Sequence, residues 1–199
     1  MGNLRWKFFG GRQHYWDKQS GDSRIEMAER RDESGELQRP QLLILMNVHS
    51  QTGRVWAAGE AVEDVEKLAG YLELGHQAWI NDAYWMFMPY KLLDPGVNLG
   101  YLGEKTMEDG RPAHVLDLTF ESEIGYTPQN RYHVWVPLES GLVEAWTFFS
   151  DAADEEPGFT MPWAKWQQFG KIRLATDHGR GKDWDIAVDE GILREFFVE

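Results

Sequence analysis

Large aromatic side chains recur at short intervals along the whole chain, and this pattern limits the possible folds more than any other feature. The 199 residues include 10 tryptophans, 10 phenylalanines and 7 tyrosines. Aromatic residues favour strands, and a few large rings are enough to fill the interior of a small sheet protein. The excess of rings predicts a curved sheet with an aromatic-lined concave face and a pocket for an apolar ligand. A large, closed, well-packed core is the alternative that the same rings allow.

Length and composition predict one domain that spans residues 1–199. The 42% of hydrophobic residues can bury a sizeable core. No apolar run approaches the roughly 20 residues of a membrane span, and the longest, Leu42 to Met46, has the length of a strand. The chain starts abruptly on the strand-like segment Leu4–Phe8, so we expect that a preceding segment is missing from the printed sequence.

The charge and the cysteine count exclude several classes of function. A formal net charge of -13 argues against a nucleic acid partner, which attracts a basic stripe, and against docking on an anionic membrane surface. The charge is better explained as a means of keeping the protein soluble. The chain contains no cysteine, which removes disulfides, thiolate catalysis and cysteine metal ligands. The missing cysteines do not decide the compartment.

Turn signals at regular intervals predict a meander of antiparallel hairpins. Four glycines each follow a polar stretch between two strand-like runs, as in a type I turn that ends in a left-handed glycine: Gly21, Gly35, Gly53 and Gly141. Asp109-Gly110 marks a further hairpin. The expected strands are Leu4–Phe9, Gln13–Trp16, Arg24–Arg30, Leu42–Val48, Arg54–Ala58, Tyr84–Met88, Leu99–Met107, Ala113–Phe120, Arg131–Val136, Leu142–Phe149, Trp163–Thr176, Asp185–Val188 and Leu193–Val198.

One segment has the spacing of an amphipathic helix. Val62, Val65, Ala69 and Leu72 recur at helical intervals, acidic residues lie near the start, and Gly75 is a candidate C-cap. The pattern predicts a helix around residues 62–74 that covers the mouth of the curved sheet. A second helical turn is expected at 76–81. The fold class is therefore α+β, mostly β: a curved antiparallel half-barrel of roughly ten strands with one covering helix.

Five stretches of sequence together resemble a known family. They are residues 79–97, Tyr101-Leu102-Gly103-Glu104, Gly125-Tyr126-Thr127-Pro128 with Arg131-Tyr132, Gly141-Leu142-Val143 with Trp146, and Leu174-Ala175-Thr176-Asp177. In order and spacing they resemble a bacterial envelope family related to the lipoprotein carriers LolA and LolB, over roughly Trp16 to Asp177.

The resemblance implies an open half-barrel closed by helices, with a cavity that receives acyl chains or other apolar molecules. It also implies export to the cell envelope or periplasm, often as a lipoprotein, and contact with other envelope proteins. The lipoprotein cysteine, the export signal and the helix that usually precedes the first strand are absent from the printed sequence. The transport role of the family need not apply to every member.

The aromatic and methionine residues of the middle and later strands form the candidate ligand site. Methionine conforms to varied shapes and suits an adaptable lining. If Tyr84–Met88 is a strand, Trp85 and Phe87 share one of its faces and Met86 and Met88 the other. The candidate ligand-binding residues are Trp79, Trp85, Phe87, Met86, Met88, Tyr101, Trp135, Trp146 and Trp166.

Catalytic and metal sites have weaker support. The 6 histidines show no metal-binding spacing, so neither a metal nor a cofactor is expected. A glycosidase-like hydrolase that uses Asp117 with Asp177 is the alternative function, although Asp117 also fits the solvated face of a half-exposed sheet. The segment 179–182 is a basic turn that could contact a ligand carboxylate or simply close a hairpin. The sequence thus favours a non-enzymatic carrier of a lipid or another hydrophobic ligand.

Overall fold

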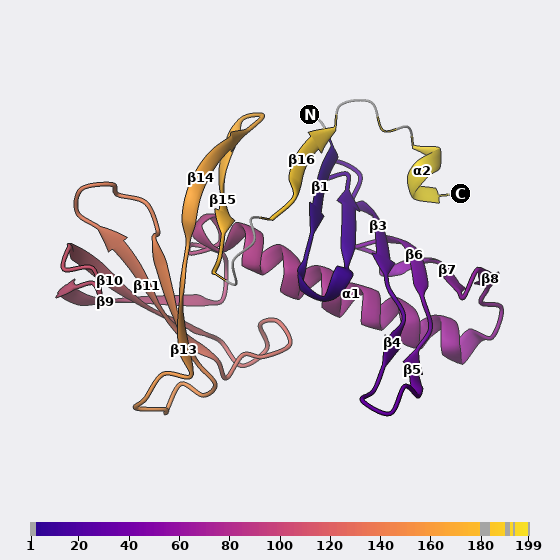
Figure 1. Cartoon of the computed structure of the whole chain (residues 1–199), viewed down its shortest axis with the longest axis horizontal. Helices are drawn as coiled ribbons and strands as arrows, with labels where there is room; N and C mark the ends of the chain where they lie inside the picture. Colours follow the sequence, from indigo (N-terminus) through magenta and orange to yellow (C-terminus); the bar gives the residue numbers. More distant parts are fainter. Residues whose placement is uncertain (1–2, 180–183, 190–191, 193, 199) are drawn as a thin grey trace. The chain divides into compact units, whose positions relative to one another are not determined.

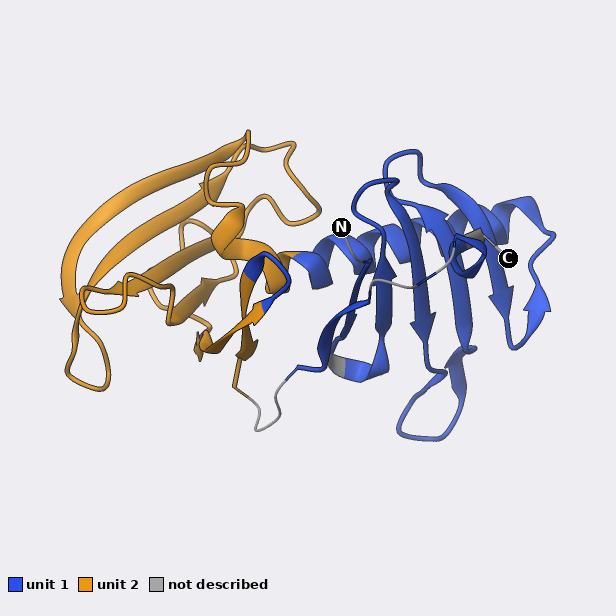
Figure 2. Ribbon diagram, turned by 90° about the horizontal axis from the view of Figure 1, so that it is seen from above, with its two compact units in different colours: residues 1–83, 169–172, 184–199 blue, residues 84–168, 173–183 orange. Residues whose placement is uncertain are grey.

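Two compact units make up the chain in the computed structural model (Figure 1), which describes residues 3–179, 184–189, 192 and 194–198. Unit 1 comprises Met1–Ala83, Phe169–Ile172 and Trp184–Glu199. Unit 2 comprises Tyr84–Gln168 and Arg173–Asp183, and Figure 2 colours the two units blue and orange. The basic turn at 179–182 lies almost wholly outside the described residues. A single domain over the whole chain stays a prediction.

Unit 1 is built on a seven-stranded antiparallel sheet. Its strands, in spatial order, are β16 (Ile186–Asp189), β1 (Asn3–Lys7), β2 (Gln13–Trp16), β3 (Asp22–Met27), β6 (Leu42–Asn47), β7 (Thr52–Ala57) and β8 (Glu60–Ala61). The short β4 (Arg30–Arg31) and β5 (Leu37–Arg39) form a separate hairpin between β3 and β6. A 3-10 turn, η1 (Phe9–Gly11), joins β1 to β2.

Unit 2 is built on a five-stranded antiparallel sheet. Its strands, in spatial order, are β13 (Phe159–Pro162), β12 (Ala145–Phe149), β11 (Arg131–Pro137), β10 (Pro112–Phe120) and β9 (Val97–Thr106). A two-stranded sheet of β14 (Ala164–Phe169) and β15 (Ile172–Asp177) follows. The long strands of unit 2 bend along their length (Figure 2). The mostly β, antiparallel and open architecture is confirmed, but the strands divide between two main sheets.

The long helix α1 (Val65–Phe87) differs from the expected helix in both of its ends. It starts at Val65 because the Asp64 carboxylate accepts a hydrogen bond from the Lys67 backbone N–H, as an N-cap does. It continues to Phe87, just before the 3-10 turn η2 (Met88–Tyr90), where Pro89 cannot extend an α-helix. The expected strand Tyr84–Met88 and the expected break after residue 74 are therefore wrong.

The stripe that α1 buries runs along its whole length. Leu68, Leu72 and Trp79 pack on a cluster of buried residues from β3, β6 and β7 in unit 1. Asp82 and Met86 continue the same stripe and are buried at 0% and 1% exposure. Helical spacing thus extends well past residue 74, but a carboxylate interrupts its apolar character.

Gly75 lies within α1 and is not a C-cap. A Cβ atom added there would come within 3.0 Å of Ile44 Cδ1 and 3.3 Å of Met46 Sδ, so the glycine allows the helix to approach β6 closely.

Four of the expected turn glycines have a positive φ, at Gly21, Gly35, Gly110 and Gly141. Gly53 does not. It lies in β7, where an added Cβ would collide with the Leu45 carbonyl oxygen.

Two expectations for the C-terminal third are also corrected. The expected strand Trp163–Thr176 is a hairpin of β14 and β15, because Gly170 reverses the chain with a φ of 58°. The expected strand Leu193–Val198 is instead the short helix α2 (Glu195–Val198). The Phe196 ring of α2 lies 4.8 Å from the Tyr15 ring and 4.4 Å from the Arg24 guanidinium, so α2 packs on unit 1.

Substitutions of two glycines of α1 test how closely the helix packs on the sheet. Gly70→Leu adds a side chain where no atom lies within 4 Å, so we expect it to stabilise the protein by up to about 1 kcal/mol through helix propensity. Gly75→Leu forces α1 away from Ile44 and should destabilise the protein by about 1–3 kcal/mol. Urea unfolding followed by circular dichroism measures both, and equal effects of the two variants would contradict the packing described.

Candidate functional site

Unit 2 contains a cluster of aromatic rings packed between its five-stranded sheet and the last residues of α1. We call Tyr84, Trp85, Tyr132, Trp146 and Trp163 the aromatic cluster; all five belong to the hydrophobic core of this unit or pack on it. β11 and β12 place Tyr132 and Trp146 on one face of the sheet, since Val134 pairs directly with Trp146 and Tyr132 lies two residues before Val134.

The rings of the aromatic cluster contact one another in both stacked and edge-on geometries. Trp85 stacks on Trp146 with centroids 4.4 Å apart, and Trp163 lies 5.2 Å from Trp146. Tyr132 meets Trp146 edge-on at 4.6 Å. Each such pair contributes about 0.5–1.5 kcal/mol beyond the buried area. Burial raises the pKa of Tyr84 and of Tyr132, so both phenols stay neutral at physiological pH.

Two donors of the aromatic cluster lack an acceptor in the described part of the chain. The indole N–H groups of Trp146 and Trp163 are buried, and neither has a hydrogen-bond partner among the described residues. The side chains themselves are 2% and 0% exposed. Nearby indoles differ: Trp166 Nε1 donates to the Val143 carbonyl at 2.9 Å, and Trp135 Nε1 donates to Thr147 Oγ1 at 3.0 Å. A buried donor without a partner costs about 1–3 kcal/mol, and such groups are uncommon in folded proteins.

The nine predicted ligand-binding residues do not form one site. Trp85, Met88, Trp146 and Trp166 pack in or against the core of unit 2. Trp79 packs against the core of unit 1 instead. Trp135 lies on the opposite face of β11 from Tyr132, and Tyr101 is 59% exposed on β9, where its hydroxyl lies 2.9 Å from His114 Nδ1. Met86 is buried on α1 and Phe87 is half-buried at its end.

Three residues of the aromatic cluster, Tyr84, Tyr132 and Trp163, are missing from the predicted ligand-binding residues. The sequence predicts Trp163 at the start of a strand, Tyr84 at the start of the expected strand Tyr84–Met88, and Tyr132 in the expected strand Arg131–Val136 and in the family resemblance. The alternation of β11, in which Tyr132, Val134 and Val136 take one face, was the available signal for Tyr132. Trp163 follows β13 and precedes β14, so no strand periodicity includes it.

The hydrolase alternative is not supported. Asp117 Oδ1 accepts a hydrogen bond from Arg131 Nε at 2.7 Å, and Asp177 Oδ2 lies 3.4 Å from Lys165 Nζ. Each carboxylate thus pairs with its own cation, which is the geometry of a structural ion pair.

Among the described residues, no group of three or more histidine or acidic side chains could hold a metal ion. Within those residues, no helix combines the length and the apolar character that crossing a membrane requires.

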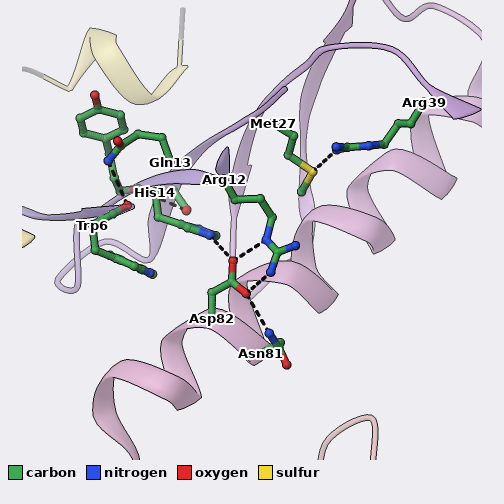
Figure 3. A network of polar contacts seen from close by, with 10 residues as sticks. Trp6, Arg12, Gln13, His14, Met27, Arg39, Asn81 and Asp82 are labelled. Atoms are coloured by element: carbon green, nitrogen blue, oxygen red, sulfur yellow. Dashed lines mark hydrogen bonds and ion pairs between the residues drawn. The ribbon is translucent and has the colours of Figure 1, made fainter. Parts of the chain in front are cut away.

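Unit 1 contains a buried network of polar groups centred on Asp82 (Figure 3). Arg12 Nε and Nη2 donate to the two carboxylate oxygens, each at 2.6 Å, and His14 Nε2 lies 2.7 Å from Oδ2. Asn81 Nδ2 adds a fourth bond at 2.8 Å. Trp6 stacks on the His14 ring at 4.6 Å. The network joins α1 to β2. The hydrophobic periodicity of the sequence does not indicate that these two elements lie together.

The electrostatics of this network follow from burial and pairing. Burial alone would raise the pKa of Asp82, but the bonds from His14 and Arg12 outweigh it and lower the pKa. Burial lowers the pKa of His14, and the Asp82 bond only partly opposes this. His14 is therefore neutral at physiological pH and donates its Nε2 proton, which leaves the buried Nδ1 without a partner. The arrangement fits a structural clamp.

Removing the carboxylate tests the clamp. Asp82→Ala leaves the Arg12 guanidinium and the buried His14 ring without their acceptor, so we expect a loss of about 3–5 kcal/mol in the free energy of unfolding. Glu29→Ala removes one partner of the exposed pair with Arg31 and serves as the control, with no measurable change expected. Urea unfolding compares the variants, and equal stabilities would show that the network does not hold α1.

The pH dependence of stability tests the neutral state of the buried imidazoles. Burial lowers the pKa of His14, and lowers that of His178 to about 4. Because both groups bind a proton more readily in the unfolded chain, near pH 6.5, stability is complete above that pH and is lost as the pH falls toward 5. Each histidine contributes up to about 1.4 kcal/mol per pH unit. His14→Gln should flatten the slope, and an unchanged slope would contradict the assignment.

Comparisons with known proteins give structural neighbours only. No protein-family model matches the chain, and a search of curated proteins finds no match. Among solved structures, the LolA superfamily protein NE2245 from Nitrosomonas europaea is 11% identical with a TM-score of 0.45, over 99% of this chain and 87% of that one. A domain from Vibrio parahaemolyticus, classed as an outer membrane lipoprotein-sorting protein domain, is 10% identical with a TM-score of 0.40, over 98% and 86%.

Proposed function

We propose that this chain is a non-enzymatic binding or carrier protein that holds a lipid or another hydrophobic ligand against the aromatic cluster of unit 2. The observation that carries the proposal is the pair of buried indole N–H groups, on Trp146 and Trp163, that no described residue accepts. A ligand with an oxygen acceptor would remove a cost of about 1–3 kcal/mol for each donor that it pairs with.

The surroundings of the two indoles suit an apolar molecule. Trp85 and Tyr132 provide rings, and Met88 provides a flexible thioether that adapts to varied shapes. Each methylene that leaves water for such surroundings contributes about 0.8 kcal/mol. A chain of about a dozen methylenes can therefore offset the cost of association without any catalytic group.

Some of the remaining predicted ligand-binding residues lie beside the ligand in this proposal, and others do not. Trp166 packs on the same core and borders the ligand in this proposal. We also place Met86 and Phe87, at the end of α1, beside the ligand. Trp79, Trp135 and Tyr101 lie elsewhere, and we assign them no contact with this ligand. In keeping with the sequence resemblance, we propose the bacterial cell envelope or periplasm as the location and other envelope proteins as partners, and we treat residues 1–199 as one functional domain.

Binding measurements with two probes test the proposal. N-phenyl-1-naphthylamine is apolar and fluoresces more strongly out of water, and dodecanoate adds a carboxylate acceptor to a similar apolar body. We expect both probes to bind the unmodified chain. Trp146→Phe and Trp163→Phe each remove one N–H and keep a ring. They should weaken dodecanoate binding about 10–150-fold, as the loss of one hydrogen bond to a charged group predicts, and leave the naphthylamine nearly unaffected.

The matched control is Trp166→Phe, because the N–H of Trp166 already donates to a backbone carbonyl of the protein. This variant should leave the preference between the two probes unchanged. Circular dichroism confirms that each variant is folded. A chain that binds neither probe, and that carries no lipid in native mass spectrometry after gentle purification, would refute the proposal.

A further inference from the structure

The outer edge of β9 is a free strand edge. β9 is ten residues long and ends the five-stranded sheet, and no described strand pairs with its outer side. The opposite edge strand, β13, has only four residues and ends in Pro162. Most of β9 is exposed, including two large apolar side chains, Leu99 at 38% and Tyr101 at 59%. Long exposed edges with apolar side chains are templates for pairing with another chain.

The hydrogen bonds of β9 show which backbone groups face outward. The Glu121 N–H donates to the Gly96 carbonyl at 2.9 Å, so these residues form a hydrogen-bonded pair of the antiparallel ladder. Such pairs alternate with non-hydrogen-bonded pairs, in which the backbone N–H and C=O groups point away from the partner strand. Val97, Leu99 and Tyr101 belong to these non-hydrogen-bonded pairs with β10. The backbone groups of Leu99 and Tyr101 therefore point away from β10, toward the free side.

The side chains of the same residues continue the apolar face of unit 2. Leu99 lies opposite Leu118, Tyr101 opposite Leu116, and Val97 opposite Phe120. The three partners on β10 belong to the core of this unit or pack on it. The core thus extends to the sheet edge and ends at side chains that water reaches. One strand segment presents both an unpaired backbone and an apolar stripe.

We propose that two copies of this chain associate through their β9 edges in an antiparallel pair centred on Leu99. In this register Leu99 lies opposite Leu99 of the second copy, and Val97 lies opposite Tyr101 of the second copy on each side. The stripe is therefore complementary to itself, and no charged residue of the segment 97–101 faces another. The proposal rests on the sheet edge alone and does not depend on the proposed ligand.

Two features of the chain set the strength of this association. The register of β9 and β10 shifts between His114 and Leu116, opposite Gly103, whose φ is 85°. This bulge redirects the strand, so the regular pairing is limited to the segment before it. Each copy also has a net charge of -13, which opposes association until salt screens it. We therefore expect a weak, salt-strengthened dimer.

Disulfide trapping tests the register, because the chain has no cysteine of its own. Leu99→Cys places two thiols opposite each other, with Cα atoms about 5.5 Å apart, within the range of a disulfide. Asn98→Cys is the matched control, since residue 98 lies opposite Gly100 of the second copy and its thiols are offset along the strands. We expect Leu99→Cys to cross-link at least about tenfold faster under mild oxidation. Equal rates would overturn the proposed register.

Sedimentation velocity on the cysteine-free chain tests the association itself. The proposal predicts a dimer whose fraction rises between about 0.05 and 0.5 M NaCl, and its loss in Leu99→Lys, which places a charge at the centre of the edge. A chain that stays monomeric at ~1 mM in high salt overturns the proposal.

Discussion

The structure depends on the buried carboxylate of Asp82, which fixes α1 against β2. Its two oxygens receive both arms of the Arg12 guanidinium and the His14 imidazole, so a charge in the interior is fully paired. A carboxylate in this position fixes the rotation of the helix about its axis. Any rotation would separate the Asp82 carboxylate from the Arg12 guanidinium and leave both charges without a partner.

Much of the fold follows from local sequence. Alternating apolar residues and turn glycines such as Gly21 and Gly110 predict antiparallel hairpins, and most of the expected strands are present within a few residues. The predicted helix is too short because Gly75 resembles a C-cap, whereas it lies inside α1 and lets the helix approach β6 closely. The carboxylate of Asp82 also indicates a surface position when its partners are unknown. Those partners, Arg12 and His14, lie about 70 residues away in sequence, and periodicity carries no information about such a pairing. The division into two sheets is likewise a matter of which strands pair, and alternation does not report it.

The candidate site was harder to predict than the fold. Trp85, Met88, Trp146 and Trp166 do share one core, as expected from their residue types. Trp135 does not join them because it takes the other face of β11, and Tyr101 does not because it lies on the exposed edge strand β9. Both the face of a ring and its place in the sheet depend on which strands pair. Trp85 was assigned a strand face that it does not have, since it lies on α1. The unpaired state of the Trp146 and Trp163 N–H groups is a property of packing alone, and no sequence pattern predicts it.

The most direct test of the account observes those two N–H groups. Indole N–H signals of a protein labelled with ¹⁵N appear in their own region of a proton–nitrogen NMR spectrum, and single Trp→Phe variants assign them. On addition of dodecanoate, the account predicts that the Trp146 and Trp163 signals move downfield as they gain an acceptor, while the signals of Trp166 and Trp135, already bonded within the protein, stay in place. Unchanged signals for Trp146 and Trp163 under saturating ligand would contradict it.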